Sequence, residues 1–403
     1  MPTMANDTSS LTVYLIAGEQ SGDLLGARLM RALKAMAESR GIAIEFSGIG
    51  GENMRAEGLE SLIEIRELAL MGFAEILPHI PRLLKHIRRT ADDILRQQPD
   101  IVVTIDSPGF NFRVTKACRK EWPKDAGGPP FVHYVAPSVW AYRPQRAAKL
   151  ATLYDAVLTL LPFEPPYFEA EGMEATFVGH PVVETAEEVR QQADPASLRT
   201  HHRIPATEPV VAMLPGSRRG EIRRHIPLLR KTALLLADSM PNIHLVMPVV
   251  PHLQEEVQQL TANWPLNLTI VNSADQRWDA FACADVALAK SGTVTLELAI
   301  TQTPTVVFYK VNPISAWLIR RMLRTKWVTL INLLHDNEYI PEFLQEDAQP
   351  EHLANAVLEL LQNRTAKEKQ EAAAQQALTM LGMGDALTPS QKAAASLWRI
   401  LER

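Results

Sequence analysis

Residues 15–26 read LIAGEQSGDLLG, a stretch that indicates how the N-terminal part of the chain folds. The apolar run over 11–17 has the length and composition of a strand that is buried on both faces. Beyond the glycines, apolar side chains recur at helical spacing over 24–36. The stretch is therefore a strand-to-helix turn. In an open α/β sheet such turns lie at the carboxyl ends of the strands, where ligands bind.

Two interpretations fit the polar residues of this turn. In the first, Ser21 caps the helix and Asp23 complements its dipole, so both are structural. In the second, the turn also lines a ligand pocket, because capping does not require an acidic residue between Gly18 and the cap. We therefore take Glu19, with Ser21, Gly22 and Asp23, as candidate site residues.

The composition is that of an ordinary globular protein, with 46% apolar and 22% charged residues among 403. A chain of this length predicts two domains. Its net charge of −5 provides no general attraction to nucleic acid, so we expect no nucleic-acid partner and only local contacts with anionic surfaces. The two cysteines, Cys118 and Cys283, suggest neither a disulfide framework nor a thiolate metal site.

The N-terminal residues MPTMANDTSS lack the basic and apolar regions of a signal peptide. No uninterrupted apolar run approaches the roughly 20 residues that span a bilayer. We therefore expect a cytoplasmic protein.

Short apolar runs that alternate with helical patterns predict a parallel sheet with helices on its faces in each half of the chain. The predicted strands cover 11–17, 43–47, 101–106, 131–135 and 155–161 in the first half, and 210–214, 243–247, 268–271, 285–289, 305–309 and 328–331 in the second. The expected architecture is α/β, with Rossmann-like domains over 1–183 and 209–363, a ligand cleft between them and a polar connection over 184–208. We expect helices over the C-terminal residues 364–403, which can pack back on the first domain.

The second half contains a turn with the residues of a phosphate site. LPGSRRGE follows a predicted strand and precedes a helical pattern. Backbone amides at Gly216 and Ser217 can therefore face an anion, and Arg218 can bind phosphate through two N–H groups.

A similar turn, KSGTVTLE, follows another predicted strand of the same half. Ser291, Gly292 and Thr293 offer hydroxyls and amides to a pyrophosphate, and Glu297 can accept hydrogen bonds from ribose hydroxyls. Either turn alone is also typical of an ordinary strand-to-helix connection, with Glu297 as a solvated helix residue. Two such turns in one domain favour a nucleotide.

The glycine spacing excludes two common nucleotide motifs. Gly18, Gly22 and Gly26 are four residues apart, which matches neither G-x-G-x-x-G nor G-x-x-x-x-G-K-[ST]. No D-x-D pair and no His/Cys cluster is present, so we expect neither a metal ion nor another cofactor. The charge of a diphosphate would then be balanced by Arg218 and by helix dipoles.

Two segments combine apolar and basic residues, MGFAEILPHIPRLLKHIRR over 71–89 and NPISAWLIRRMLRTKW over 312–327. Each is typical either of an ordinary core-facing helix with a solvated face or of a membrane interface, where basic residues lie beside Trp and Leu. The candidate membrane contacts are Phe73, Ile76, Leu77, Leu84, Arg88, Trp317, Arg320, Arg321, Arg324 and Trp327.

Eleven stretches between Gly18 and Gln345 resemble, in order, the lipid A disaccharide synthase family of bacterial glycosyltransferases. They are AGEQSGDLLGA, MGFAEILPHIPRLLK, IDSPGFNF, HYVAPSVWAYRPQRAAK, LPFEPPYF, FVGHPVVE, LPGSRRGEI, KSGTVTLELAI, FYKVNPISAWLIRRML, INLL and PEFLQ. The resemblance implies a GT-B fold and transfer of 2,3-diacylglucosamine from its UDP conjugate to the 6-hydroxyl of 2,3-diacylglucosamine 1-phosphate, with inversion. It implies a peripheral place on the cytoplasmic face of the inner membrane, with anionic lipid as a partner, and leaves a homo-oligomer open.

By the same resemblance, Glu19 and Asp106 face the reacting sugars. Arg218, the Ser291 turn and Glu297 belong to the nucleotide side, and the same cleft is lined by Asn332, Glu342 and Gln345. The chain departs from the family pattern at Gly109, where many relatives have a second acid, at Tyr142, and in HDNEYIPEFLQ over 335–345.

We take Asp106, at the end of IVVTID, as the general base and Glu19 as the second choice. The alternative for Asp106 is an Asx turn with Ser107 and Pro108. Two other functions remain as hypotheses: another GT-B nucleotide-sugar enzyme, such as an epimerase or a lipid glycosyltransferase, and a non-catalytic lipid-surface binding protein.

Overall fold

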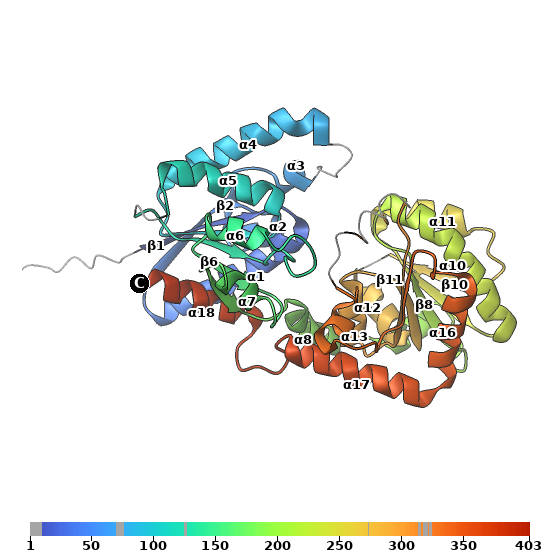
Figure 1. Ribbon diagram of the computed structural model, residues 1–403. Coiled ribbons are helices and arrows are strands. Elements are labelled where there is room, and N and C mark those ends of the chain that lie inside the picture. Colours follow the sequence, from blue (N-terminus) through green and yellow to red (C-terminus); the bar gives the residue numbers. More distant parts are fainter. Residues whose placement is uncertain are drawn as a thin grey trace, which may run out of the picture. The chain divides into compact units, whose positions relative to one another are not determined.

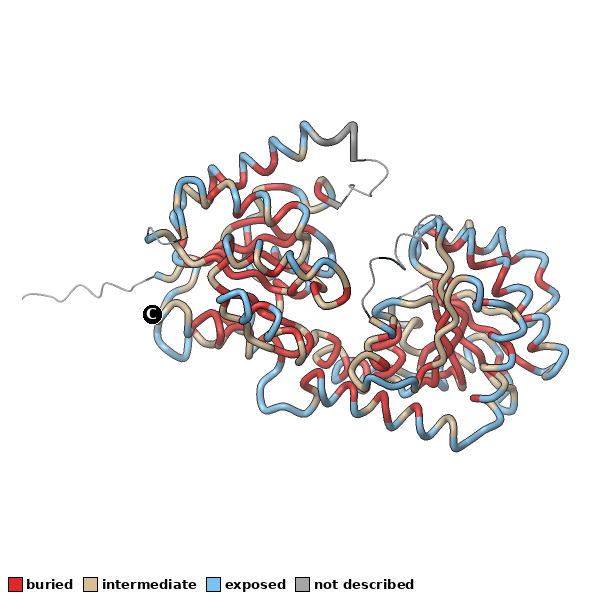
Figure 2. Tube along the Cα trace, viewed as in Figure 1, coloured by how far each residue is buried: buried red, intermediate tan, exposed pale blue. Residues whose placement is uncertain are grey.

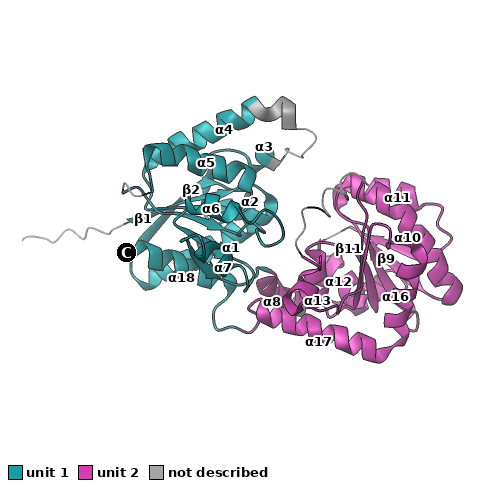
Figure 3. Cartoon of the chain, viewed as in Figure 1, with its two compact units in different colours: residues 1–181, 385–403 teal, residues 182–384 magenta. Residues whose placement is uncertain are grey.

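The computed structural model describes residues 10–69, 76–124, 127–272, 274–312, 316, 321 and 325–403 (Figure 1). Only the backbone is described at 69, 76–80, 190, 191, 274 and 275. The chain divides into two compact units (Figure 3). The first contains Met1–Pro181 and Asp385–Arg403, and the second contains Val182–Gly384.

The first unit is built on a 7-stranded parallel sheet with the order β3-β2-β1-β4-β5-β6-β7. Its strands are β1 (Ser10–Ala17), β2 (Ala43–Ile49), β3 (Glu60–Ser61), β4 (Ile101–Ile105), β5 (Phe131–Tyr134), β6 (Ala156–Thr159) and β7 (Glu174–Phe177). After β1 the chain continues to β2 on one side of the pair, and after β4 it continues to β5 on the other side. Strands β1 and β4 themselves pair, with Ala17 opposite Ile105. The topological switch point, where ligands bind in such sheets, therefore lies between these two strands.

Helices cover both faces of this sheet. They are α1 (Gln20–Ser39), α2 (Glu52–Ala56), α3 (Ile65–Ala69), α4 (Ile76–Gln97), α5 (Pro108–Glu121), α6 (Arg146–Ala151), α7 (Pro165–Glu169) and α18 (Pro389–Leu401). On β1, Leu15 packs in a core with α1 and α18, whereas Tyr14 and Ile16 pack in a core with α4 and α5. The strand is buried from Val13 to Ala17, and burial on both faces explains why these residues are apolar (Figure 2).

The second unit has a 6-stranded parallel sheet with the order β10-β9-β8-β11-β12-β13. Its strands are β8 (Val210–Leu214), β9 (His244–Pro248), β10 (Leu268–Val271), β11 (Val286–Lys290), β12 (Thr305–Tyr309) and β13 (Glu342–Leu344). Here the switch point lies between β8 and β11. These are the two strands that lead into LPGSRRGE and KSGTVTLE.

The helical elements of the second unit also lie on both faces of its sheet. They are α8 (Val182–Gln192), α9 (Pro195–His201), α10 (Arg219–Ser239), the 3₁₀ turn η1 (Pro251–Leu253), α11 (Gln254–Thr261), α12 (Ala274–Cys283), α13 (Val294–Ile300), α15 (Leu330–His335), α16 (Pro350–Gln362) and α17 (Arg364–Met380). Helices α10 and α16 share one core with the sheet, and α9, α12 and α13 share the other. The polar segment 184–208, expected as a connection, contains α9 and most of α8.

Ten of the eleven predicted strands are confirmed, and the strand over 328–331 is wrong. Leu330 begins helix α15, whose N-cap Thr329 accepts a hydrogen bond from the Asn332 amide at 3.4 Å. The Glu342 carboxylate accepts hydrogen bonds from the amides of Val328 and Thr329, at 2.9 and 2.8 Å. These amides therefore face a side chain instead of a neighbouring strand. The short strands β3, β7 and β13 were not predicted.

Within the described part of the chain, no helix combines the length and the apolar character that a membrane crossing needs.

Candidate active site

Asp106 follows β4 directly, at the switch point of the first sheet. Its amide donates to the carbonyl of Tyr134 on β5 at 2.9 Å. The φ angles of Asp106 and Ser107 are 48° and 44°, a left-handed conformation that costs each residue about 1–3 kcal/mol. The buried Asn111 side chain holds this turn by donating to the carbonyl of Asp106 at 2.7 Å. Backbone strain of this kind concentrates at functional sites.

The Asp106 carboxyl is half-buried, and burial raises its pKa, while a hydrogen bond from the Ser107 backbone lowers it. A raised pKa makes a carboxylate a stronger proton acceptor. Helix α5 begins immediately after this turn, at Pro108.

Glu19 occupies the N-cap position of α1 and is exposed, but its side chain does not cap the helix. The structural interpretation of Ser21 as the cap is wrong, because the helix already begins at Gln20 and Ser21 lies in its first turn, exposed. Gly22 is buried, with Ala17 and Ile105 around it.

Asp23 is buried and binds the segment after β2. Its carboxylate accepts hydrogen bonds from the amides of Gly51, Asn53 and Met54 and from the Asn53 side chain, at 2.7 to 3.0 Å. This carboxylate therefore joins α1 to the start of α2. These bonds explain its position without a ligand.

The second unit has a cavity of about 410 Å³ at its switch point. It is lined by three of the predicted groups: Gly216 and Ser217 after β8, the turn Ser291–Gly292–Thr293 after β11, and Glu297 on α13. The sequence interpretation missed the other polar lining residues, which are Asn272, Arg277 and Lys290. For Lys290 a signal existed, since a lysine ends the apolar strand VALAK. For Arg277 we find none.

The turn after β8 requires a glycine at position 216. Its φ is +116°, and a Cβ there would lie 2.5 Å from Oε2 of Glu221. The same Oε2 accepts a hydrogen bond from the Ser217 amide at 3.3 Å, and Oε1 lies 3.1 Å from Nζ of Lys290.

Arg277 and Glu297 form a pair on the cavity wall, with Nη1 3.6 Å from Oε2. Burial raises the pKa of Glu297, and the Arg277 charge lowers it. The guanidinium of Arg277 stacks over Trp278 at 4.8 Å from the ring centroid. Its Nε is buried without a hydrogen-bond partner among the described residues, which leaves an unsatisfied donor in a residue that lines this cavity.

Arg218 is the N-cap residue of α10, is exposed and is absent from the lining of the 410 Å³ cavity. Burial raises the pKa of the Tyr309 phenol, and the positive charge of Arg218 opposes this shift in part.

Asn332, Glu342 and Gln345 lie around the connection from α15 to β13, and none of the three lines the 410 Å³ cavity. The fully buried Asn332 donates to the Ile340 carbonyl at 2.7 Å and to the Glu342 carboxylate at 2.9 Å. Its own oxygen accepts from the amides of Tyr339 and Ile340. The Gln345 side chain accepts from the Val311 amide at 3.2 Å. The side chains of Asn332 and Glu342 thus form a buried hydrogen-bonded network.

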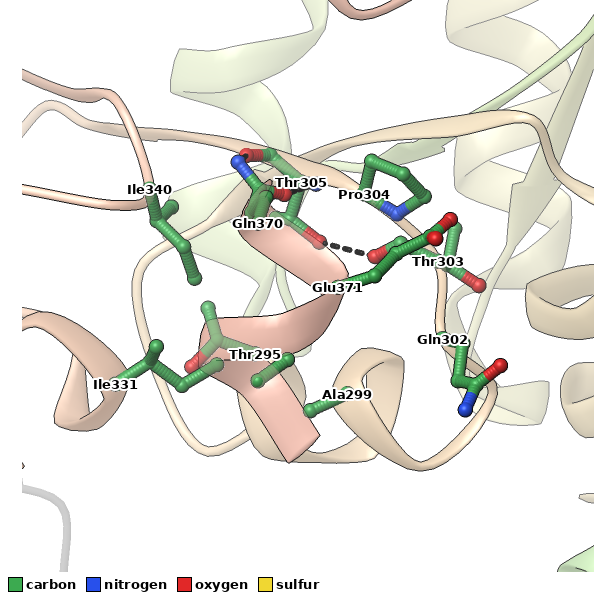
Figure 4. A pocket seen from close by; sticks show the side chains of 11 residues that line it. Thr295, Ala299, Gln302, Thr303, Pro304, Thr305, Ile331, Ile340, Gln370 and Glu371 are labelled. Carbon is green, nitrogen blue, oxygen red and sulfur yellow. Dashed lines mark hydrogen bonds between the residues drawn. The ribbon is translucent and has the colours of Figure 1, made fainter. Parts of the chain in front are cut away.

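A much smaller cavity of about 10 Å³ lies beside α17 (Figure 4). Figure 4 shows Gln370 next to Thr305, to which it is hydrogen-bonded through both the amide and the carbonyl of that residue. A space of this size holds at most one water molecule. It is no substrate site.

The predicted membrane contacts lie partly outside the described residues. This holds for Phe73, Trp317, Arg320 and Arg324, and the side chains of Ile76 and Leu77 are likewise outside the description. Leu84, which is 48% exposed, and Arg88 lie on α4 and line a surface hollow of about 800 Å³ with Leu62, Pro81, Lys85, Arg89, Asp92, Asp93 and Arg96. Arg321 is exposed.

Trp327, in contrast, is only 8% exposed, so the expected membrane contact of this side chain is wrong. Its indole Nε1 donates to the Asp336 carboxylate at 3.2 Å, at the C-terminal end of α15. A buried indole usually finds such a partner for its N–H.

A family model described as lipid-A-disaccharide synthetase matches residues 13–395 of the chain. The chain belongs to the lipid-A-disaccharide synthase family. The lipid-A-disaccharide synthase of Rhodospirillum centenum is 43% identical over 98% of this chain and 95% of that protein, and that of Paramagnetospirillum magneticum is 45% identical over 95% and 96%. The resemblance of the sequence motifs is confirmed. Like its family, the chain is a glycosyltransferase of lipid A biosynthesis.

Solved structures with low sequence identity share the fold of this synthase. UDP-GlcNAc 2-epimerase from Neisseria meningitidis matches with a TM-score of 0.63 at 13% identity, over 97% of this chain and 100% of that one. MurG from Acinetobacter baumannii matches with a TM-score of 0.52 at 15% identity, over 97% and 99%. The predicted α/β class with a GT-B fold is confirmed.

Among the described residues, no three His, Cys, Asp or Glu side chains gather in a way that could hold a metal ion.

Proposed function

We propose that this lipid-A-disaccharide synthase binds the UDP part of UDP-2,3-diacylglucosamine in the 410 Å³ cavity of its second unit. The observation that carries the proposal is that both phosphate-type turns line this one cavity, at the switch point between β8 and β11. The lining also contains the cations Arg277 and Lys290. A diphosphate would use the Gly216 amide, the hydroxyls of the second turn and these positive charges, since the Ser217 amide donates to Glu221.

The acceptor is 2,3-diacylglucosamine 1-phosphate, and Asp106 is its general base. As its 6-hydroxyl oxygen forms a bond to the anomeric carbon of the donor, the carboxylate takes the hydroxyl proton. The bond from the anomeric carbon to the diphosphate breaks on the opposite face, so the configuration inverts and UDP leaves. Burial and the strained turn support this role, since a half-buried carboxylate with a raised pKa is a stronger base.

Glu19 is the second candidate for the base, because it follows β1 at the same switch point and is exposed. In this mechanism the protein's own cations and amides stabilise the departing UDP, and no metal ion takes part.

Both substrates carry acyl chains, and the hollow on α4 offers a surface for the membrane that holds them. Its exposed Leu84 lies among Lys85, Arg88 and Arg89, a combination suited to anionic headgroups and the boundary of the acyl region. The protein would then act peripherally, on the cytoplasmic face of the inner membrane.

The test is an assay of the purified protein with UDP-2,3-diacylglucosamine, with and without 2,3-diacylglucosamine 1-phosphate. Disaccharide 1-phosphate and UDP in equal amounts, formed only when both substrates are present, are the expected products. An epimerised UDP-sugar formed without acceptor would instead favour an epimerase. No turnover of either substrate would contradict the proposal.

A further inference from the structure

Lys290 is a cation at the meeting point of the two phosphate-type turns. It is the last residue of β11, its side chain is 21% exposed, and it lines the 410 Å³ cavity. A Cβ atom on Gly292 would lie 3.7 Å from its Nζ, so the ammonium group stands beside the turn after β11. The same Nζ lies 5.1 Å from the centre of the Tyr309 ring.

A carboxylate from the other turn holds this ammonium group. Glu221 lies in the first turn of α10, its side chain is 11% exposed, and it is absent from the cavity lining. Its Oε1 lies 3.1 Å from Nζ of Lys290, while Oε2 accepts the Ser217 amide at 3.3 Å. One carboxylate thus connects the turn after β8 to the end of β11. Gly216 leaves room for it, because a Cβ at that position would meet Oε2 at 2.5 Å.

The ion pair leaves Lys290 with binding capacity. An ammonium group has three N–H donors, and the carboxylate of Glu221 accounts for one of them. A largely buried cation is costly unless it is paired, so the carboxylate of Glu221 stabilises the charge of Lys290. A second anion at the two turns would meet donors that are already in position.

The other cations near the cavity are placed differently. Arg277 comes from α12 and pairs with Glu297 on α13. Arg218 is exposed and does not line the cavity. Lys290 is therefore the lining cation that is tied to both turns.

We infer that Lys290 binds the diphosphate of the nucleotide and that Glu221 is the positioning residue that holds the lysine between the two turns. The inference rests on the proposed function, because it places UDP in this cavity. As the sugar–phosphate bond breaks, negative charge grows on the diphosphate, and a fixed ammonium group would stabilise it.

Ligand size provides the first test. UDP and UMP binding are measured by calorimetry, and uridine binding by NMR titration, for the parent protein, for Lys290→Met and for Lys231→Met. Lys231 is an exposed lysine of α10 that does not line the cavity, so its variant controls for loss of one positive charge. We expect Lys290→Met to weaken UDP binding at least ~10-fold, the usual scale for a hydrogen bond to a charged group. UMP binding should weaken less, uridine binding should stay equal, and the control should match the parent.

Equal UDP affinity of Lys290→Met and parent would overturn the inference. So would an equal loss for UDP and uridine, which would mean that the whole pocket is altered. If the parent itself binds no UDP, the proposed function fails instead, and the two failures are thereby distinguished.

A double-mutant cycle tests the role of Glu221. Glu221→Gln should weaken UDP binding ~3- to 10-fold in the parent background and have no effect in the Lys290→Met background, because it acts through the lysine. The same loss in both backgrounds, or tighter UDP binding by Glu221→Gln alone, would overturn the positioning role. Glu221→Asp, which keeps the charge, replaces Glu221→Gln if melting curves show that the latter is unfolded. Lys290→Arg should retain most of the UDP affinity.

Discussion

Gly18 and Ser107 lie so close together that a Cβ atom on Gly18 would stand 2.4 Å from Oγ of Ser107. The two residues follow β1 and β4, the strands on either side of the switch point of the first sheet. Each is the immediate neighbour of a candidate base, Glu19 or Asp106. This close approach therefore determines how the loop that carries Glu19 packs against the loop that carries Asp106.

Gly18→Ala should reduce turnover without weakening UDP binding. Its methyl group would push Ser107 and with it the strained turn at Asp106, and a displacement of about 1 Å at a reacting group can cost ~10²-fold in rate. Steady-state turnover and UDP calorimetry measure the two effects. Gly109→Ala is the matched control, because the nearest atom to its added Cβ would be 3.9 Å away, on Arg113. Normal turnover of Gly18→Ala would show that the loop tolerates the shift.

Asp106→Asn should lower turnover by ~10²-fold or more, because the amide cannot accept a proton. UDP affinity and melting temperature should change little, since the nucleotide is proposed to bind in the second unit. All three quantities are measured on one preparation. If turnover is nearly normal, the base is another group, with Glu19 next in line. A large fall in melting temperature would instead make Asp106 structural.

The pH profile supplies a second measurement on Asp106. Burial raises the pKa of this carboxyl above its ordinary value of 3.8, and the base is active only when deprotonated. Turnover of the parent should therefore fall as the pH decreases through the raised pKa, at a higher pH than for an ordinary aspartate. The residual turnover of Asp106→Asn should lack this step. An unchanged profile in the variant would assign the step to a different group.

Activity should survive excess EDTA. Lys290, Arg277 and the hydroxyls of Ser291 and Thr293 line the cavity and are available to interact with the charge of the diphosphate. The disaccharide assay with and without the chelator measures this directly. Complete loss of activity that added Mg²⁺ restores would contradict a metal-free mechanism.

The α4 surface should bind anionic vesicles in a salt-sensitive manner, because its cations attract lipid headgroups within about one Debye length. Replacing Lys85, Arg88 and Arg89 by Ser should reduce sedimentation with such vesicles and leave UDP binding intact. A triple Ser variant of the scattered exposed residues Lys120, Lys231 and Lys369 removes the same charge as a control. Equal sedimentation of the α4 variant and the control variant would indicate that α4 is an ordinary core-facing helix with a solvated face.

Asn332→Ala should destabilise the second unit and leave UDP affinity unchanged. The substitution removes the partners of the Ile340 amide and carbonyl and of the Tyr339 amide, and buried polar groups left unpaired cost about 1–3 kcal/mol each. Denaturant unfolding and calorimetry separate the two quantities. A stable variant with weakened UDP binding would instead support the nucleotide contact that the family resemblance implies.

The alternation of strands and helices was predictable from the sequence, because burial on both faces of a parallel strand leaves a short apolar run. Strand β1 and the runs before both phosphate-type turns are of this kind. The run over 328–331 is equally apolar, yet it leads into α15. That outcome depends on Glu342, which lies beyond α15 in the chain and accepts the amides of Val328 and Thr329. A window of local sequence does not contain this contact.

The sequence by itself determined the class of fold, the family and the two turns that carry Gly216 and Ser291, since periodicity and turn composition are local properties of the chain. Only the tertiary structure decided which residues share a cavity. The sheet order places β8 beside β11 and thereby brings Glu221 to Lys290. The tertiary structure likewise leaves Arg218 exposed, buries Trp327 and brings the Asp23 carboxylate to the amides after β2. Charge pairing and burial depend on neighbours that are distant along the chain, and these neighbours are set by strand order.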